Sequence, residues 1–417
     1  MNLNYPRIQS EIILNLLNSS SHRVIFVRGP RQVGKTFLMR KHVLPTLNQD
    51  KCHYIAVDSA EQMILSGDTS VLSEIGVEKD VRWLVDLWNR ARQIARASGE
   101  QYVLVIDEIQ KIKGWSETVK GLSDQDRNDE LNLHVVLLGS SPLLIGKGVS
   151  ESLLGRFDPV NVTHWSFAEM MEAFDFDLND YIYFGGYPGS AKYVGNEDSW
   201  RAYVRNALVQ PNIEIDILKM IRIDKPALFK QLFELSCSYS GEILSYNKML
   251  GQLQDAGNTT TLAHYLDLLE RAGLVIGIQQ YSEKPIKTKQ SSPKLNVLNT
   301  ALMSIASSYT KEQAIADRSY WGRMVESAVG AHIYNTMDAN TKLYYWREGN
   351  YEVDFVIERG GKLFAIEVKS GAKKQKLPGL DVFAEKFKNR STQKILVGLD
   401  GISIAEFLSY PMEHWLE

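Results

Sequence analysis

The chain has 417 residues, enough for two to four domains that each bury a hydrophobic core. Its composition, with 44% hydrophobic and 23% charged residues, is that of an ordinary globular protein. The net charge of -3 excludes a protein that is basic over its whole surface, so any nucleic-acid contact must come from a local patch.

The chain begins with an expected amphipathic helix over residues 7–17, with Ile8, Ile12, Ile13 and Leu16 on one face. A short buried strand is expected next, over residues 24–27. A strand at this point matters because of the glycine-rich segment that follows it.

The segment GPRQVGKT, residues 29–36, fits the phosphate-loop pattern G-x-x-x-x-G-K-[ST] at every fixed position. Gly29 and Gly34 can take backbone angles closed to other residues, which lets successive N–H groups turn toward a phosphate. Lys35 is expected to reach the β and γ phosphates, and the Thr36 hydroxyl to bind magnesium at the start of a helix that ends near Pro45. The alternative is a glycine-rich turn that matches by chance. The expected nucleotide-binding residues are Gly29, Pro30, Arg31, Gln32, Val33, Gly34, Lys35, Thr36 and Phe37.

Two acidic residues end another predicted strand. After a strand over residues 53–57 and a helix over residues 80–98, the run YVLVIDE brings Asp107 and Glu108 to the carboxyl edge of a buried strand, where ligands bind in open α/β sheets. Asp107 is expected to hold the magnesium ion and Glu108 to polarise the attacking water. The alternative is a pair of acids that caps the following helix.

Two further residues are candidates for the same site. The strand over residues 134–138 is followed by Ser140 and Ser141, and either hydroxyl is a candidate to bind the γ-phosphate or the water, or else only a turn residue. Arg156 is a candidate to neutralise charge on the transferring phosphoryl group, in the same or a neighbouring subunit. The alternative for Arg156 is a surface salt bridge.

The segments GPRQVGKT, VLVIDEIQ, LLGSSPLL, ESLLGRF, HWSFAEM and FGGYPG together resemble the AAA-like ATPases related to the STAND class, which occur in archaea and some bacteria. The resemblance implies about five parallel strands, a helical lid and a C-terminal domain of unknown function. It also implies that the Gly-Tyr-Pro motif, with Pro188, lies near the nucleotide base. The alternative for this motif is a simple turn.

Beyond a helical connector over residues 200–221, interrupted at Pro211, three helices and two strands predict a winged helix-turn-helix, as the resemblance also implies. Lysines at positions 284, 287, 289 and 294 form a basic wing, and polar residues 258–261 with His264 begin the third helix. DNA contact is the expectation, and a protein-interaction module is the alternative.

The last segment contains Glu326, Asp354, and Glu367 followed two positions later by Lys369. In this order, E…D…E-x-K, it is similar to the restriction-endonuclease-like core. Asp354 and Glu367 are the expected ligands of a divalent cation, Glu326 completes its shell, and Lys369 is the expected catalytic lysine. The alternative is a solvated strand face on which Glu367 and Lys369 form an ion pair. Lysines 373, 374 and 376 are a candidate phosphate track.

The predicted fold class is therefore α/β: an AAA-like P-loop domain (1–190), a helical lid or connector (191–225), a winged helix-turn-helix (226–300) and a restriction-endonuclease-like domain (301–417). We expect ATP and Mg²⁺ as cofactors, and ATP hydrolysis that switches a DNA-binding, nuclease-like module. An ATP-gated scaffold for protein partners and an ATP-licensed nuclease are the competing functions, and a kinase-like activity is disfavoured.

Cys52 and Cys237 lie too far apart in sequence to suggest a disulfide framework or a metal pattern. The N-terminus lacks the apolar core of a signal peptide, and no apolar run is long enough to span a bilayer. We expect a cytoplasmic protein with no membrane partner, and a homo-oligomer if Arg156 acts in a neighbouring subunit.

Overall fold

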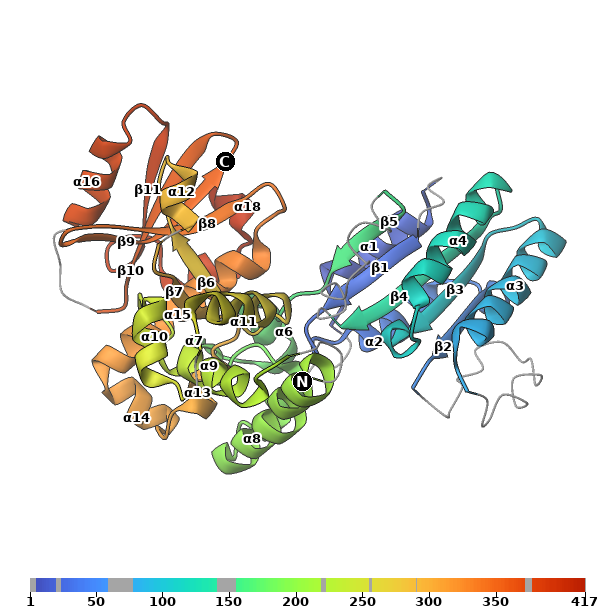
Figure 1. Cartoon of the computed structure of the whole chain (residues 1–417), viewed down its shortest axis with the longest axis horizontal. Helices are drawn as coiled ribbons and strands as arrows, with labels where there is room; N and C mark the ends of the chain where they lie inside the picture. Colours follow the sequence, from blue (N-terminus) through green and yellow to red (C-terminus); the bar gives the residue numbers. More distant parts are fainter. Residues whose placement is uncertain are drawn as a thin grey trace. The chain divides into compact units, whose positions relative to one another are not determined.

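The computed structural model describes residues 5–19, 24–58, 78–140, 155–218, 223–254, 257–289, 291–371 and 377–416. The chain divides into two compact units, with the boundary between residues 162 and 163, and each unit has its own sheet (Figure 1). Ser141 and the lysines 373, 374 and 376, which the sequence singled out, lie outside the described residues.

The first unit is built on a five-stranded sheet in the order β2-β3-β4-β1-β5, and every neighbouring pair is parallel. This arrangement confirms the expected parallel sheet. The strands are β1 (Val24–Gly29), β2 (Cys52–Ala56), β3 (Tyr102–Asp107), β4 (Leu133–Ser140) and β5 (Phe157–Asn161). The helices are α1 (Ile8–Leu17), α2 (Lys35–Leu38) with a π-helical turn after it (Met39–Val43), α3 (Val81–Ser98) and α4 (Trp115–Asn128).

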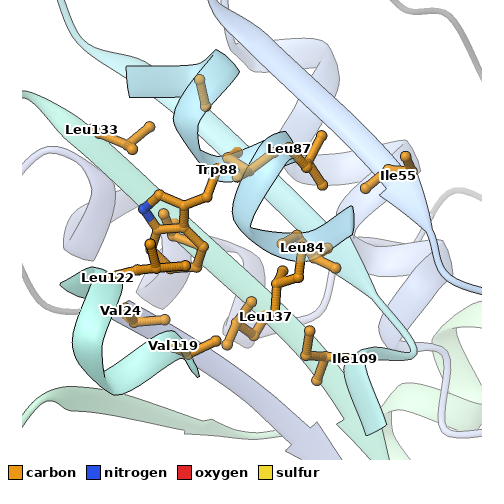
Figure 2. Close-up of a cluster of buried hydrophobic side chains, with 14 of the residues drawn as sticks. Val24, Ile55, Leu84, Leu87, Trp88, Ile109, Val119, Leu122, Leu133 and Leu137 are labelled. Carbon is orange, nitrogen blue, oxygen red and sulfur yellow. The ribbon is translucent and has the colours of Figure 1, made fainter. Parts of the chain in front are cut away.

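Alternation along the strands supplies two hydrophobic cores, one on each face of this sheet. Helices α3 and α4 cover one face, where Trp88 packs among leucines of both helices and of β4 (Figure 2). Helices α1 and α2 cover the other face, where Val27 and Val105 are fully buried. Because both faces are covered, the central strands β3, β4 and β1 are mostly apolar, and ligands have access mainly at the strand ends.

Helix α1 forms where the sequence predicts it but buries a different row of side chains. Ile13 and Leu17 are buried, whereas Ile8 and Ile12 are 60% and 43% exposed. The expected face was therefore wrong for these last two residues. Two adjacent apolar rows run along this helix, and their spacing does not determine which row meets the sheet.

The second unit contains a six-stranded mixed sheet in the order β11-β10-β9-β8-β6-β7. Its strands are β6 (Val275–Gln280), β7 (Lys294–Val297), β8 (Lys342–Glu348), β9 (Tyr351–Arg359), β10 (Lys362–Lys369) and β11 (Thr392–Gly398). Strands β6 and β7 are antiparallel, and β6 pairs with β8 in parallel, so the hairpin that follows the three middle helices extends the C-terminal sheet.

The helices of this unit confirm most of the sequence pattern. Those before the hairpin are α6 (Phe167–Phe174), α7 (Leu178–Phe184), α8 (Glu197–Tyr203), α9 (Pro226–Ser238), α10 (Tyr246–Gln252) and α11 (Thr259–Arg271). Those after β6 are α12 (Pro285–Lys289), α13 (Ala301–Ala306), α14 (Lys311–Ala316), α15 (Arg318–Thr336), α16 (Pro378–Lys386), α17 (Ile404–Ser409) and α18 (Met412–Trp415). Ser245 and Asn258 cap α10 and α11 through their side-chain oxygens, as small polar residues do at helix starts.

The connector after α8 differs from the prediction at Pro211. The sequence placed a break there, but helical backbone continues through Pro211, which has φ −63°, between π-helical segments Val204–Val209 and Asn212–Ile217. Proline lacks an N–H and clashes with the carbonyl four residues earlier, and wider π-type turns relieve both problems without ending the helix.

No helix in the described ranges has both the length and the apolar character needed to cross a membrane. Cys52 and Cys237 are buried free thiols.

Candidate nucleotide site and carboxylate cluster

The phosphate loop joins β1 to α2, as expected. The structure requires its two glycines for different reasons. Gly34 has φ +92° and Gln32 φ +64°, the left-handed region in which the loop reverses into the helix. Gly29 is needed for space: a Cβ there would lie 1.9 Å from the carbonyl oxygen of Val162, the residue after β5. The expected reason for Gly29 was a special backbone angle, whereas in the structure the close approach of the Val162 backbone requires a glycine there.

Lys35, the first residue of α2, points back over the loop. Its Nζ donates to the carbonyl oxygens of Gly29, 3.0 Å away, and Pro30, 2.7 Å away. The side chain is buried, with the residue only 7% exposed. The loop therefore holds this ammonium beside the backbone that is expected to surround a phosphate.

Thr36 and Asp107 meet at the carboxyl edge of the sheet. Thr36 Oγ1 donates to Asp107 Oδ2 across 2.6 Å. Tyr54, from the neighbouring strand β2, donates to the same oxygen across 2.8 Å. A hydroxyl and a carboxylate at this distance are oxygen ligands of the kind that a hard divalent cation takes, so these residues fit Mg²⁺.

Tyr54 was not among the expected site residues. Burial and the Asp107 carboxylate raise the pKa of its phenol, so the hydroxyl stays protonated and donates. The sequence shows a tyrosine in the strand before the one that ends in the acidic pair. It does not show that these two strands are neighbours in the sheet, which is what places Tyr54 beside Asp107.

Glu108 follows β3 with φ +57°, an unusual backbone angle for a residue with a side chain. Its N–H donates to Asp107 Oδ1 across 2.8 Å, and its Oε2 accepts from Gln110 Nε2 across 2.6 Å. Burial and the neighbouring Asp107 raise the pKa of Glu108 above its ordinary value, against the opposing effect of Lys35. A raised pKa brings a carboxylate closer to the range in which it accepts a proton efficiently.

Lys35, Thr36 and Glu108 line a cavity of about 610 Å³. Its lining includes Arg31, Gln32, Gly34, Lys35, Thr36, Phe37, Arg40, Lys41, Asp58, Glu108 and Ser140. Ser140 ends β4, the strand between β1 and β3, and its buried Oγ has no hydrogen-bond partner among the described residues. An unsatisfied hydroxyl at this edge is available for a ligand.

Arg156 lies just before β5 and forms an ion pair with Asp124 of α4, with Nε and Oδ1 2.7 Å apart. Both side chains are partly exposed. The pair is the surface salt bridge that was the alternative for this residue, and the role of Arg156 in charge neutralisation stays a prediction.

Pro188 belongs to the second unit, where it begins a 3₁₀ turn (Pro188–Tyr193). The glycines before it are packed tightly: a Cβ on Gly185 would lie 2.0 Å from Asn299 Oδ1, and one on Gly186 2.2 Å from the Trp165 carbonyl oxygen. Packing within the unit therefore accounts for both glycines. The proximity of Pro188 to a nucleotide base stays a prediction.

The acidic residues of the C-terminal segment do come together. Asp354 on β9 accepts from the Val368 N–H through Oδ2, across 2.8 Å, just beyond the last paired residues of β9 and β10. On β10, Lys369 Nζ lies 2.6 Å from Glu367 Oε1, so both residues share a face as predicted. Burial and the Asp354 charge raise the pKa of Glu367, and its other oxygen, Oε2, has no hydrogen-bond partner among the described residues.

A further lysine lies within this cluster. Lys294 was expected in the basic wing, but it is 0% exposed, and its Nζ lies 2.5 Å from Glu326 Oε1, 3.6 Å from Asp354 Oδ1 and 3.8 Å from Glu352 Oε1. The prediction that it faces DNA phosphates is therefore wrong. Among the described residues, no group of three or more His, Cys, Asp or Glu side chains is arranged to hold a metal ion. The assignment of Asp354, Glu367 and Glu326 to a metal site stays a prediction.

Three family models match consecutive parts of the chain. Residues 21–171 match an AAA domain, residues 175–313 a domain of unknown function, DUF8612, and residues 321–405 another domain of unknown function, DUF4143. The first match spans the phosphate loop, the acidic pair and all five strands of the parallel sheet.

Two curated relatives are similar over most of the chain. The uncharacterized protein MJ1544 of Methanocaldococcus jannaschii is 24% identical over 301 residues, which are 67% of this chain and 64% of the relative. An uncharacterized protein of Haemophilus influenzae is 24% identical over 267 residues, 61% of this chain and 62% of the relative. The chain thus spans slightly less than two thirds of either relative.

Among solved structures, AMPPCP-bound DnaA from Aquifex aeolicus is 14% identical, with 64% of this chain and 90% of that chain covered, at a TM-score of 0.31. The RuvB branch migration motor of Thermotoga maritima is 16% identical, with 68% and 93% covered, at a TM-score of 0.30. Similarity at this level carries no argument about this chain. Residues 21–171 are therefore similar to AAA domains in sequence, and they contain the phosphate loop and the parallel sheet of a P-loop fold; the regions that match DUF8612 and DUF4143 follow in the same polypeptide.

Proposed function

We propose that the first unit binds ATP with Mg²⁺ and hydrolyses it. The observation that carries the proposal is the 2.6 Å contact between Thr36 Oγ1 and Asp107 Oδ2 at a cavity lined by Lys35 and Glu108. When bound, Mg²⁺ would neutralise phosphate charge, with Thr36 and Asp107 as its protein ligands.

The protein groups divide the remaining tasks. The loop N–H groups and Lys35 bind the phosphates, and Glu108 orients water and accepts its proton. Ser140 donates its hydroxyl, which has no partner among the described residues, to the γ-phosphate or to that water.

Calorimetric titration of the full chain with ATP in magnesium buffer tests this proposal. We expect saturable binding that is lost in Lys35→Ala and retained in Lys113→Ala, a matched change at an exposed lysine of the same unit. Absence of uptake by the wild-type chain, or equal uptake by Lys35→Ala, would contradict it.

For the second unit we propose DNA binding that depends on the nucleotide state. The support is the order of three helices and a hairpin, with Thr260 and His264 exposed on α11 and Lys284 and Lys287 exposed between β6 and β7. Exposed lysines of this kind contact phosphates, and the polar side chains of α11 can approach base edges.

DNA affinity measured with ADP and with a non-hydrolysable ATP analogue, at one salt concentration, tests the dependence on nucleotide. Equal affinities would defeat the coupling. A Lys284→Ala/Lys287→Ala double variant is expected to weaken binding and to lower the salt slope by roughly two. Its matched control is Lys362→Ala/Lys388→Ala, which removes two exposed lysines elsewhere in the unit.

The competing function is an ATP-gated scaffold for protein partners with an inactive nuclease-like domain. The position of Lys294 among the carboxylates favours an inactive domain. The two functions separate in the DNA experiment, because a scaffold would bind neither single- nor double-stranded DNA or RNA in either nucleotide state.

A further inference from the structure

The carboxylate cluster of the second unit contains an ammonium group of its own. Lys294, the first residue of β7, is completely buried, and three carboxylates lie within 4 Å of its Nζ: Glu326 at 2.5 Å, Asp354 at 3.6 Å and Glu352 at 3.8 Å. Its Nζ also donates to the main-chain oxygen of Asp354 across 3.2 Å. These groups come from three elements, β7, β9 and α15.

Close packing of α15 on the sheet holds this arrangement. A Cβ on Gly330 would lie 2.5 Å from Asn296 Oδ1 and 2.8 Å from the Phe355 ring, so only glycine permits this approach to β7 and β9. Glu326 lies one helical turn before Gly330 and on the same face, which brings its carboxylate over Lys294. The Phe355 ring, 5.0 Å from Nζ, helps to exclude water.

The charges explain why a lysine is buried here. An isolated buried ammonium would lose its proton, because burial disfavours the charged form. The carboxylates of Glu326 and Asp354, 2.5 and 3.6 Å from Nζ, offset the cost of burying the ammonium group, so the side chain stays positive. It is a fixed positive charge among the carboxylates.

A divalent cation held by Glu326 and Asp354 would have to occupy the position of the Lys294 ammonium group. Mg²⁺ and Ca²⁺ bind oxygens at about 2.0–2.6 Å and in shells of six or more. The Lys294 ammonium fills the position closest to Glu326 and repels a second cation. Asp354 Oδ2 is already used by the Val368 N–H, and Glu367 Oε1 by Lys369.

We propose that Lys294 is the resident cation of the cluster formed by Glu326, Glu352 and Asp354, and that the intact chain therefore binds no divalent cation there. The endonuclease-like residues then form a structural charge cluster that ties β7 to β9 and α15. This inference concerns the second unit and does not depend on ATP binding.

Mn²⁺ binding to the nucleotide-free full chain, followed by the electron paramagnetic resonance signal of free Mn²⁺, tests the proposal. We expect wild type and Asp354→Asn to bind Mn²⁺ equally. Lys294→Met is expected to gain one Mn²⁺ site per chain, which is lost again in Lys294→Met/Asp354→Asn. Lys294→Arg, which keeps the charge, is the matched control and is expected to gain none.

Two results of the Mn²⁺ binding experiment would overturn the proposal. One is a wild-type Mn²⁺ site that disappears in Asp354→Asn, and this comparison decides the question even if Lys294→Met does not fold. The other is a folded Lys294→Met, checked by near-UV circular dichroism, that gains no site. A DNA-cleavage assay adds an independent readout: Mn²⁺-dependent cleavage by wild type that is absent in Asp354→Ala would also overturn it.

Discussion

Thr36 donates a hydrogen bond to Asp107 across 2.6 Å, although 71 positions of sequence separate the two residues. One belongs to the helix after β1 and the other ends β3, and β4 lies between these strands. The contact exists because parallel strands bring their carboxyl ends to one edge. It joins the phosphate loop to the acidic pair and makes the region a candidate Mg-nucleotide site.

Asp107→Asn is expected to weaken Mg-ATP binding by roughly 1.5–3 kcal/mol, since an amide replaces a charged cation ligand. Calorimetry with and without Mg²⁺ measures the effect, which should vanish when Mg²⁺ is absent. Tyr54→Phe removes a different hydrogen bond from the same carboxylate and serves as the control, with a smaller expected loss. Identical losses with and without Mg²⁺ would argue against a role in cation binding.

Glu108→Gln is expected to bind ATP normally and to hydrolyse it about 10²–10⁴ times more slowly, because the amide does not accept the proton of water. In the wild type, kcat should fall with decreasing pH as the carboxylate becomes protonated. Burial and Asp107 raise the pKa of Glu108, so this fall should lie above the ordinary glutamate range. A steady-state pH profile that stays flat down to pH 4.5 would be inconsistent with Glu108 as the base.

Ser140→Ala is expected to leave ATP affinity near its wild-type value and to lower kcat roughly two- to tenfold, the value of one neutral hydrogen bond. Ser123→Ala is a matched control, because Ser123 on α4 is also buried with an Oγ that has no partner among the described residues. Only the change at Ser140 should alter turnover. Equal turnover of both variants and wild type would remove Ser140 from the site.

Variants of Arg156 and of its ion-pair partner Asp124 distinguish between two possible roles of Arg156. If the side chain serves only the ion pair, Arg156→Ala and Asp124→Asn should have equal and small effects on ATP turnover. If Arg156 neutralises phosphoryl charge in a neighbouring subunit, Arg156→Ala should cost about 10³–10⁵ in kcat while Asp124→Asn leaves it unchanged. Turnover per chain should then rise with protein concentration. We predict the second outcome, and ATPase assays over a dilution series decide.

Glu270 on α11 gives a stability prediction for the second unit. Burial raises its pKa to about 7, although the Tyr334 hydroxyl donates to its Oε1. The folded state therefore binds a proton more readily than the unfolded chain, so stability falls as pH rises from about 4.5 to 7 and stays low above that range. Glu270→Gln should raise the free energy of unfolding at pH 8 by roughly 1–3 kcal/mol and change it little at pH 5. Denaturant unfolding at both pH values measures this, and an equal change at both would contradict it.

The sequence alone determined the local parts of this protein. Strands, most helices and the phosphate loop follow from apolar periodicity, small polar caps such as Ser245 and Asn258, and a glycine spacing that depends on neighbours within a few residues. The E-x-K spacing likewise predicted that Glu367 and Lys369 share a face, because side chains alternate along one strand.

Only the tertiary structure decided which distant groups meet. In the folded chain Tyr54 donates to Asp107, and Ile13 and Leu17 are the residues of α1 that are buried. Lys294, expected to contact DNA, is instead the ion-pair partner of Glu326. From the sequence, a lysine in a basic segment such as that of Lys294 is expected to be solvent-exposed. Its burial follows only from the pairing of β7 in the sheet. The physical reason is that the environment of a charge depends on strand order and helix packing, which local periodicity does not contain.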